Sequence, residues 1–206
     1  MLIPEVRILP VFKKVKAVRE HMNLYHVDGG SHRLSVDTLA KSIADMYALK
    51  IELYEVYAPG SRVAGNVERY QNGRAIILVK AELSDAMKRF VAVKELCHLM
   101  IDEDDDWSSL GVDTIKEMKV EFDLADKGGE GVSNPSRTQQ SEHLAWMAAV
   151  SLMYPCEFHV TDKAAVDAKT VTIAKLGLHH DLPPHVVESA LAQGHVFSMY
   201  DRACQS

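Results

Sequence analysis

Cysteine is scarce in this chain, and what little there is does not form a pattern. The three cysteines among 206 residues, Cys97, Cys156 and Cys204, are an odd number and lie far apart. Small secreted domains that depend on disulfides carry an even set of closely spaced cysteines. A disulfide framework is therefore excluded, and a reducing cytoplasmic location is expected. A chain of this length can bury enough apolar surface to fold without disulfides.

Long hydrophobic runs and an excess of basic residues are also missing. Pro4, Arg7 and Pro10 interrupt the N-terminal segment, so it has neither a signal-peptide core nor the roughly 20 apolar residues of a membrane span. Lys and Arg number 23 against 29 Asp and Glu, and the net charge is -6. A large phosphate-binding face needs the opposite balance. We expect no membrane association and no direct binding of nucleic acid.

Hydrophobic and charged residues, at 47% and 25%, are those of an ordinary globular domain. Ser35 is a suitable N-cap for a helix ending near Leu49, because apolar residues recur behind it at helical spacing. Three predicted strands follow, over residues 50–56, 63–70 and 74–80. The turn residues before the last strand favour a small antiparallel sheet. The last strand is apolar on both faces, which predicts a position inside the sheet or beneath a helix.

The next predicted helix runs from its N-cap Ser84 to about Ile101 and is the most informative segment. Its second half is apolar except for Lys94, Glu95 and His98. At about 100° per residue these three side chains fall within one arc of the helix surface. Three ionisable groups are thus expected to converge in a mostly apolar setting.

Beyond this helix the pattern becomes helical again. Residues 115–122 suggest an amphipathic helix, and residues 127–137 form a glycine-rich loop. Thr138 is a candidate N-cap for a helix that carries Glu142 and ends at Pro155. Residues 162–192 are expected to form two helical pieces, split at 179–184.

The arrangement of Lys94, Glu95 and His98 is close to a zinc-peptidase motif. Such enzymes use two histidines one helical turn apart, a glutamate beside the first as general base, and a third ligand from elsewhere. Here the string is Lys94-Glu95-Leu96-Cys97-His98. The second half of the motif is present, and lysine stands where the first histidine should be. A Glu-x-x-His pair alone also occurs by chance in a chain of this composition.

Several segments in order resemble the ImmA/IrrE family of metallopeptidase-like proteins. The string AMKRFVAVKELCHLMID resembles the family's RRF-x-x-x-HELGHLLLH, and EHLAWMAAVSLMYP is similar to its E-x-E-A-N-x-F-A-A-E-L-L-M-P. IAKLGLHHDLPPHVVESAL resembles its closing LAKxFGVSxxAxxxRL. The likeness extends over roughly residues 35–191, and its order agrees with the family throughout.

The resemblance implies an α+β fold of the zincin-like kind: a small, mostly antiparallel sheet packed by the central motif helix, plus C-terminal helices. It divides the chain into an N-terminal extension (1–34), a peptidase-like domain (35–160) and a C-terminal helical appendage (161–206). Glu95 matches the family's general base, and His98 and Glu142 match two of its zinc ligands. Lys94 replaces the remaining histidine, while Trp146 and Leu144 replace the usual asparagine and glutamate near Glu142.

The altered site has two interpretations. In the first, no metal is bound, and the Lys94 ammonium occupies the ion's region and pairs with Glu95 or Glu142. In the second, zinc is retained through a replacement ligand such as Cys97, Asp102 or His143. A protonated lysine has no lone pair to offer a metal, which favours the first. The cofactor is accordingly none or zinc.

The resemblance also implies a function, since active family members cleave helix-turn-helix repressors that silence phages, mobile elements or stress genes. We expect a regulator whose degenerate, non-catalytic site binds a repressor-like protein. The alternative is an active zinc-dependent endopeptidase. The acidic run 102–106 is more typical of a solvated loop than of a binding site. The histidines between 179 and 195 show no regular ligand spacing and are more typical of surface or capping positions.

Overall fold

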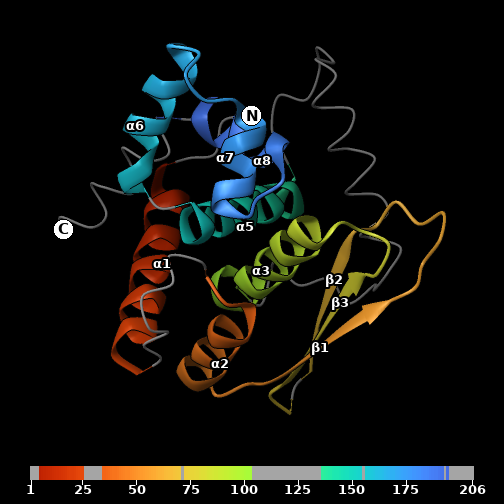
Figure 1. Ribbon diagram of the computed structural model, residues 1–206. Coiled ribbons are helices and arrows are strands. Elements are labelled where there is room, and N and C mark those ends of the chain that lie inside the picture. Colours follow the sequence, from red (N-terminus) through yellow and green to blue (C-terminus); the bar gives the residue numbers. More distant parts are fainter. Residues whose placement is uncertain are drawn as a thin grey trace.

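The computed structural model describes residues 5–25, 34–70, 72–103, 136–154, 156–192 and 194. Within them the chain is α+β, with a three-stranded sheet on one side of a helical body (Figure 1). The helix expected over 115–122 lies outside the described residues, as does the glycine-rich loop apart from residues 136 and 137. Among the described helices, none is long and apolar enough to cross a membrane.

Two helices begin where their caps were predicted. Helix α2 (Val36–Tyr47) starts behind Ser35, whose side chain accepts a hydrogen bond from the Thr38 backbone. Helix α3 (Asp85–Ile101) starts behind Ser84, which accepts from the Met87 backbone in the same way. Each serine satisfies one of the backbone N–H groups that the first turn leaves without an intrahelical partner.

The sheet differs from the prediction in its topology. Its strands are β1 (Lys50–Val56), β2 (Gly65–Arg69) and β3 (Arg74–Lys80), in the order β1-β3-β2. β2 and β3 form the expected antiparallel hairpin, but β1 pairs with β3 in parallel, so the sheet is mixed. The expectation of a mostly antiparallel sheet was therefore wrong. The apolar strand β3 takes the central place, because only there do both of its edges form hydrogen bonds.

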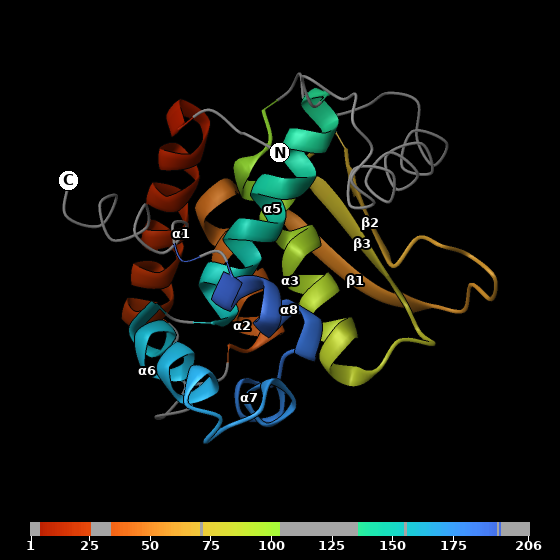
Figure 2. The same ribbon diagram turned by 90° about the horizontal axis from the view of Figure 1, so that it is seen from above.

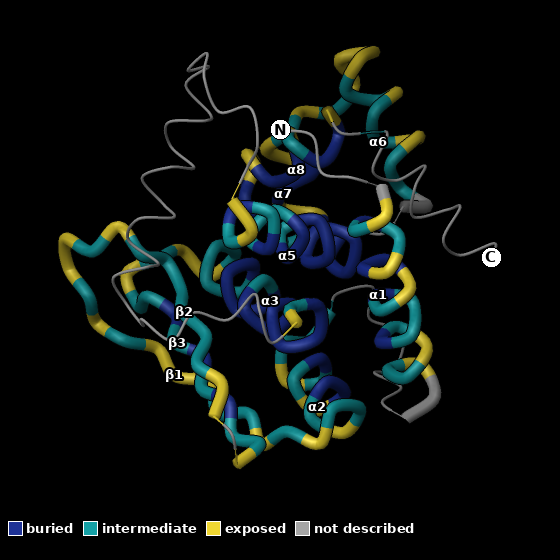
Figure 3. Tube along the Cα trace, turned by 180° about the vertical axis from the view of Figure 1, so that it is seen from behind, coloured by how far each residue is buried: buried dark blue, intermediate teal, exposed yellow. Residues whose placement is uncertain are grey.

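Helix α3 covers one face of this sheet, against the alternate residues of β3 that are fully buried. On its other side it packs against α5 (Arg137–Met153). The cap of α5 is Ser136, not Thr138, because Ser136 and Gln139 form a capping box that places the helix start two residues earlier. Figure 3 shows that α3 and α5 contain long buried stretches.

Residues 5–25 form one long helix, α1 (Glu5–Tyr25), that the sequence patterns had not predicted. Its buried side chains recur at helical spacing and join the same core as α2, α3 and α5: Ile8, Val11, Phe12, Val15 and Val18. In both ribbon views α1 and the sheet lie on opposite sides of the α3–α5 pair (Figures 1 and 2). Lys14 of α1 donates to the backbone carbonyl of Ile101 at the end of α3, at 3.5 Å.

The C-terminal part contains three helices where two pieces were expected: α6 (Cys156–Asp167), α7 (Ile173–His180) and α8 (Pro184–Ala192). The predicted break between 179 and 184 is confirmed. Polar contacts attach these helices to the body and to one another. Arg89 of α3 binds both the carboxylate and the backbone carbonyl of Asp181. The Asp162 carboxylate of α6 meets the Tyr154 hydroxyl and the His180 ring, each at 2.8 Å.

Candidate functional site: a lysine-centred cluster between two helices

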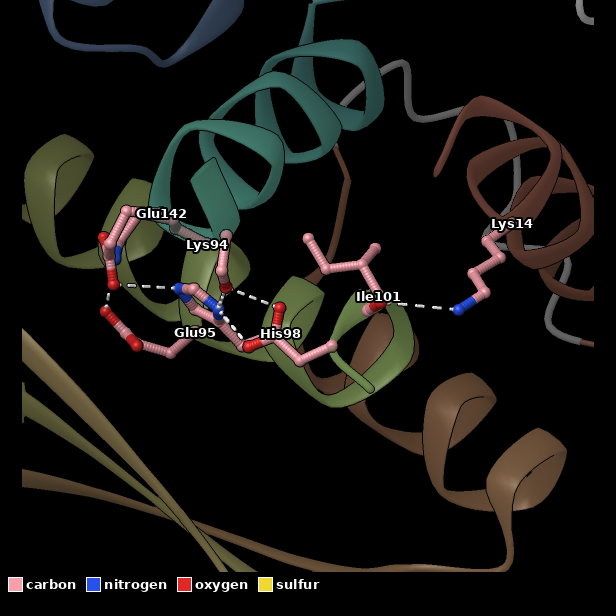
Figure 4. A network of polar contacts seen from close by, with 8 residues as sticks. Lys14, Lys94, Glu95, His98, Ile101 and Glu142 are labelled. Carbon is pink, nitrogen blue, oxygen red and sulfur yellow. Dashed lines mark hydrogen bonds and ion pairs between the residues drawn. The ribbon is translucent and has the colours of Figure 1, made fainter. Parts of the chain in front are cut away.

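The candidate site lies where α3 and α5 face each other. Lys94, Glu95 and His98 of α3 lie together, as their spacing predicted, and Glu142 of α5 meets them (Figure 4). Their burial differs: the side chains of Glu95 and His98 are 4% and 5% exposed, and that of Glu142 is 28% exposed. The four residues that the motif singled out therefore do form one cluster, which is open to solvent on the Glu142 side.

The Lys94 ammonium is the centre of this cluster. Its Nζ lies 2.7 Å from Oε2 of Glu142 and 2.9 Å from Oε1 of Glu95. Burial by itself would lower the pKa of Lys94, but the two carboxylates outweigh it and hold that pKa above its ordinary value. Lys94 is thus a permanent cation that bridges a carboxylate of its own helix to a carboxylate of α5.

His98 is held from two sides. Its Nδ1 lies 2.8 Å from Oδ2 of Asp102, one helical turn later. Its Nε2 lies 3.1 Å from Oε1 of Glu142, which is an ion-pair distance although the direction is not that of a hydrogen bond. Burial would lower the pKa of His98, but Glu142 and Asp102 raise it to about 10. Both ring nitrogens therefore carry protons at neutral pH.

Asp102 and Ser141 complete the support of His98. The Ser141 hydroxyl donates to Oδ1 of Asp102 at 2.6 Å and lies 3.3 Å from Nδ1 of His98. Ser141 precedes Glu142 on α5, so both helices contribute to fixing the imidazole. Sequence reasoning missed Ser141 entirely, and its only signal was its position beside Glu142. The sequence suggested Asp102 as a replacement metal ligand, whereas the structure places its carboxylate at Nδ1 of His98, the ring nitrogen opposite the one that faces Glu142.

Glu142 receives the opposite electrostatic effect. Burial would raise the pKa of its carboxyl group, but the charges of Lys94 and His98 lower that pKa well below the usual range. The two cations therefore stabilise the ionised form of Glu142. Each of its oxygens faces a different cation: Oε2 faces Lys94 and Oε1 faces His98.

Glycine at position 65 brings β2 close to Glu95, which sequence reasoning also missed. A Cβ atom built on Gly65 would lie 2.9 Å from Oε1 of Glu95 and 2.3 Å from a methyl carbon of Val91. No side chain larger than hydrogen fits there without a shift of its neighbours. The strand backbone thus closes the cluster on the sheet side.

The residues present do not fit a zinc ion. A zinc site needs at least three protein ligands with lone pairs. Lys94 has none when protonated, which leaves His98 and Glu142 as two of the three ligands required. In the part of the chain that the structure describes, no three His, Cys, Asp or Glu side chains are grouped so that they could hold a metal. Within the cluster, the Lys94 ammonium neutralises the carboxylates of Glu95 and Glu142.

The suggested replacement ligands lie elsewhere or serve another purpose. Cys97 is fully buried in the hydrophobic core, and burial raises the pKa of its thiol. The His143 ring stacks on Trp146, with ring centroids 6.1 Å apart. The later histidines do not gather into a site within the described residues: His180 binds Asp162, and its ring packs against that of His179. Of the suggested ligands, Asp102 contacts the cluster, where it supports His98.

Comparison of the sequence with models of known protein families gives no match, and comparison with curated proteins gives none either. The resemblance to the ImmA/IrrE family therefore depends on the motifs themselves, and the function that it implies is a proposal.

Proposed function

We propose that this protein is a non-catalytic regulator of the ImmA/IrrE kind, which binds a repressor-like protein without cleaving it. The observation that carries the proposal is the position of the Lys94 ammonium between Glu95 and Glu142. In a zincin-like site of this family, the first histidine would stand at position 94 and share a metal with His98 and Glu142. Here the cation is part of the chain.

The environment of Glu95 supports the absence of peptidase chemistry. A general base must be within reach of a water and free to accept its proton. Glu95 is 4% exposed, and one of its oxygens is paired with Lys94. The close approach of Gly65 limits the space on the sheet side. The residue that matches the family's base is therefore engaged in an ion pair.

The edge of the sheet beside the cluster supports binding of a protein. In the described part of the chain, β2 pairs only with β3, and β2 passes close to Glu95 at Gly65, where a Cβ atom would lie 2.9 Å from Oε1 of Glu95. An edge strand offers backbone N–H and C=O groups to an extended peptide, which can add as a further strand. A segment of a helix-turn-helix repressor docked there would lie next to the cluster and meet no metal.

The test combines metal content, cleavage and binding. The purified protein, prepared without chelator, is analysed for zinc, manganese and iron by elemental mass spectrometry, beside Lys94→His and the control Lys88→His on the same helix. It is then mixed with helix-turn-helix proteins encoded in the same genome. We expect less than stoichiometric metal, no cleavage, and a complex that survives EDTA in size-exclusion chromatography.

Two results would contradict the proposal. Stoichiometric metal together with repressor cleavage that Glu95→Gln abolishes would establish the alternative, an active zinc-dependent endopeptidase. Failure of every helix-turn-helix protein to bind would remove the proposed partner class. Metal uptake by Lys94→His but not by Lys88→His would support an inherited site disabled by one substitution.

A further inference from the structure

The contact between α3 and α5 contains three charged side chains that pair with one another. Lys94 and Glu95 come from α3 and Glu142 from α5, and the exposed fractions of their side chains are 17%, 4% and 28%. A buried carboxylate without a counter-charge is strongly unfavourable, so removing one member of such a group costs far more than breaking a surface pair. The stability of this interface must therefore depend on the ammonium.

A second lysine on α3 shows which feature of Lys94 matters. Lys88 also lies between two carboxylates, at 3.0 Å from Glu55 and 3.3 Å from Asp85, and its side chain is 22% exposed. The two lysines are thus similar in exposure and in the number of their partners. The partners of Lys88, however, are 53% and 100% exposed, so water solvates them when the lysine is absent.

We infer that Lys94 is a built-in structural cation that cross-links α3 to α5, so that the folded site needs no divalent metal and does not respond to one. The inference deepens the proposed function and rests on it in one respect, namely that the cluster is the inherited place of a metal. In a metal-dependent relative, loss of the ion would leave the carboxylates uncompensated. Here the counter-charge cannot dissociate.

The first experiment compares Lys94→Met with Lys88→Met by thermal unfolding followed by circular dichroism. Methionine keeps most of the length of lysine but removes the charge. We expect Lys94→Met to lower the unfolding midpoint by about 10 °C. Lys88→Met should lower it by less than about 3 °C. Equal small shifts in both variants would overturn the inference.

Two further variants keep the test decisive if Lys94→Met does not fold. Lys94→Met combined with Glu95→Gln removes the buried carboxylate that the loss of Lys94 leaves uncompensated, since Glu142 still faces His98. The double variant should recover a large part of the lost midpoint. Lys94→Ala leaves room for propylammonium, which has the atoms that the truncation removes. Propylammonium chloride should raise the midpoint of Lys94→Ala more than sodium chloride does at equal ionic strength. For Lys88→Ala the two salts should have the same effect. Absence of both effects would overturn the inference.

The metal arm uses the unmodified protein. Neither EDTA nor a small excess of zinc chloride should change its midpoint, because a ligand that binds only the folded state would raise it. A rise with zinc or a fall with EDTA would overturn the inference. These outcomes are separate from those of the proposed function. A protein that binds no repressor can still depend on Lys94 for its stability, and a protein that binds a repressor can keep its stability when Lys94 is replaced.

Discussion

Replacing Gly65 by alanine tests how closely β2 packs on α3 beside the cluster. The added Cβ would lie 2.3 Å from Cγ1 of Val91 and 2.9 Å from Oε1 of Glu95. Carbon atoms in contact are normally about 3.5 to 4.0 Å apart. Val91 is 2% exposed, and its β-branched side chain has few alternative rotamers. The neighbours of Gly65 therefore cannot easily make room.

The size and sign of the effect follow from two opposing contributions. Where alanine fits, replacing glycine stabilises a protein by about 0.4 to 1 kcal/mol, because it restricts the unfolded chain. Overpacking of a tight contact costs about 1 to 3 kcal/mol. Since the Val91 distance is more than 1 Å too short, overpacking should dominate. We expect Gly65→Ala to lower the free energy of unfolding by about 1 to 2 kcal/mol.

Urea denaturation measures this change, and a double-mutant cycle shows its origin. Val91→Ala removes the methyl groups that the new Cβ would strike, at a cost of about 2 kcal/mol for its own lost burial. The double variant should then be more stable than the sum of the single effects by at least about 1 kcal/mol. A Gly65→Ala protein as stable as the parent, or strictly additive effects, would refute the packing argument.

Three further predictions concern His98, His180 and a helix cap. The pKa of His98 is raised to about 10, so its contribution to stability is complete below its unfolded pKa near 6.5 and is lost as the pH rises through 10. Urea midpoints measured between pH 6 and 10.5 should therefore fall by an amount corresponding to about 4 kcal/mol. A midpoint that does not change with pH would contradict the assignment. Burial lowers the pKa of His180 although Asp162 lies beside it, so its contribution to stability is complete above pH 6.5 and decreases as the pH falls below 6.5. The decline of the unfolding midpoint from pH 7 to 5 should therefore be smaller in His180→Phe than in the parent. Ser84→Ala removes the N-cap of α3 and should cost about 1 kcal/mol in urea denaturation, whereas no change would show that the cap is dispensable.

Local patterns predicted the parts of the fold whose causes are local. Ser35 and Ser84 begin their helices because a serine hydroxyl reaches a backbone N–H two or three residues later. Strand β3 has its predicted bounds, Arg74–Lys80, because its run of apolar residues is closed at each end by a charged residue. Helix α1 was not predicted because Pro10, a residue that normally breaks or kinks a helix, lies inside it, although the buried side chains of α1 do show helical spacing. Its packing against the core was visible only in three dimensions.

The order of the strands could not be read from the chain. The alternation of residues shows which segments are extended, but it does not state which edge of β3 a distant strand joins. In the folded protein β3 lies between β1 and β2 and pairs with both, in parallel with β1 and antiparallel with β2. That choice depends on the whole layer and not on any one segment.

The sequence by itself determined that Lys94, Glu95 and His98 share one face of a buried helix, because 3.6 residues per turn leave no other arrangement. It also determined that position 94 carries an ammonium where a zinc peptidase would need an imidazole. Only the tertiary structure decided what that ammonium does. Glu142 is 48 residues away along the chain, and it reaches Lys94 because α5 packs against α3. The same packing brings Ser141 to Asp102, so a set of charges that seemed incomplete in the sequence is a closed network in the folded protein.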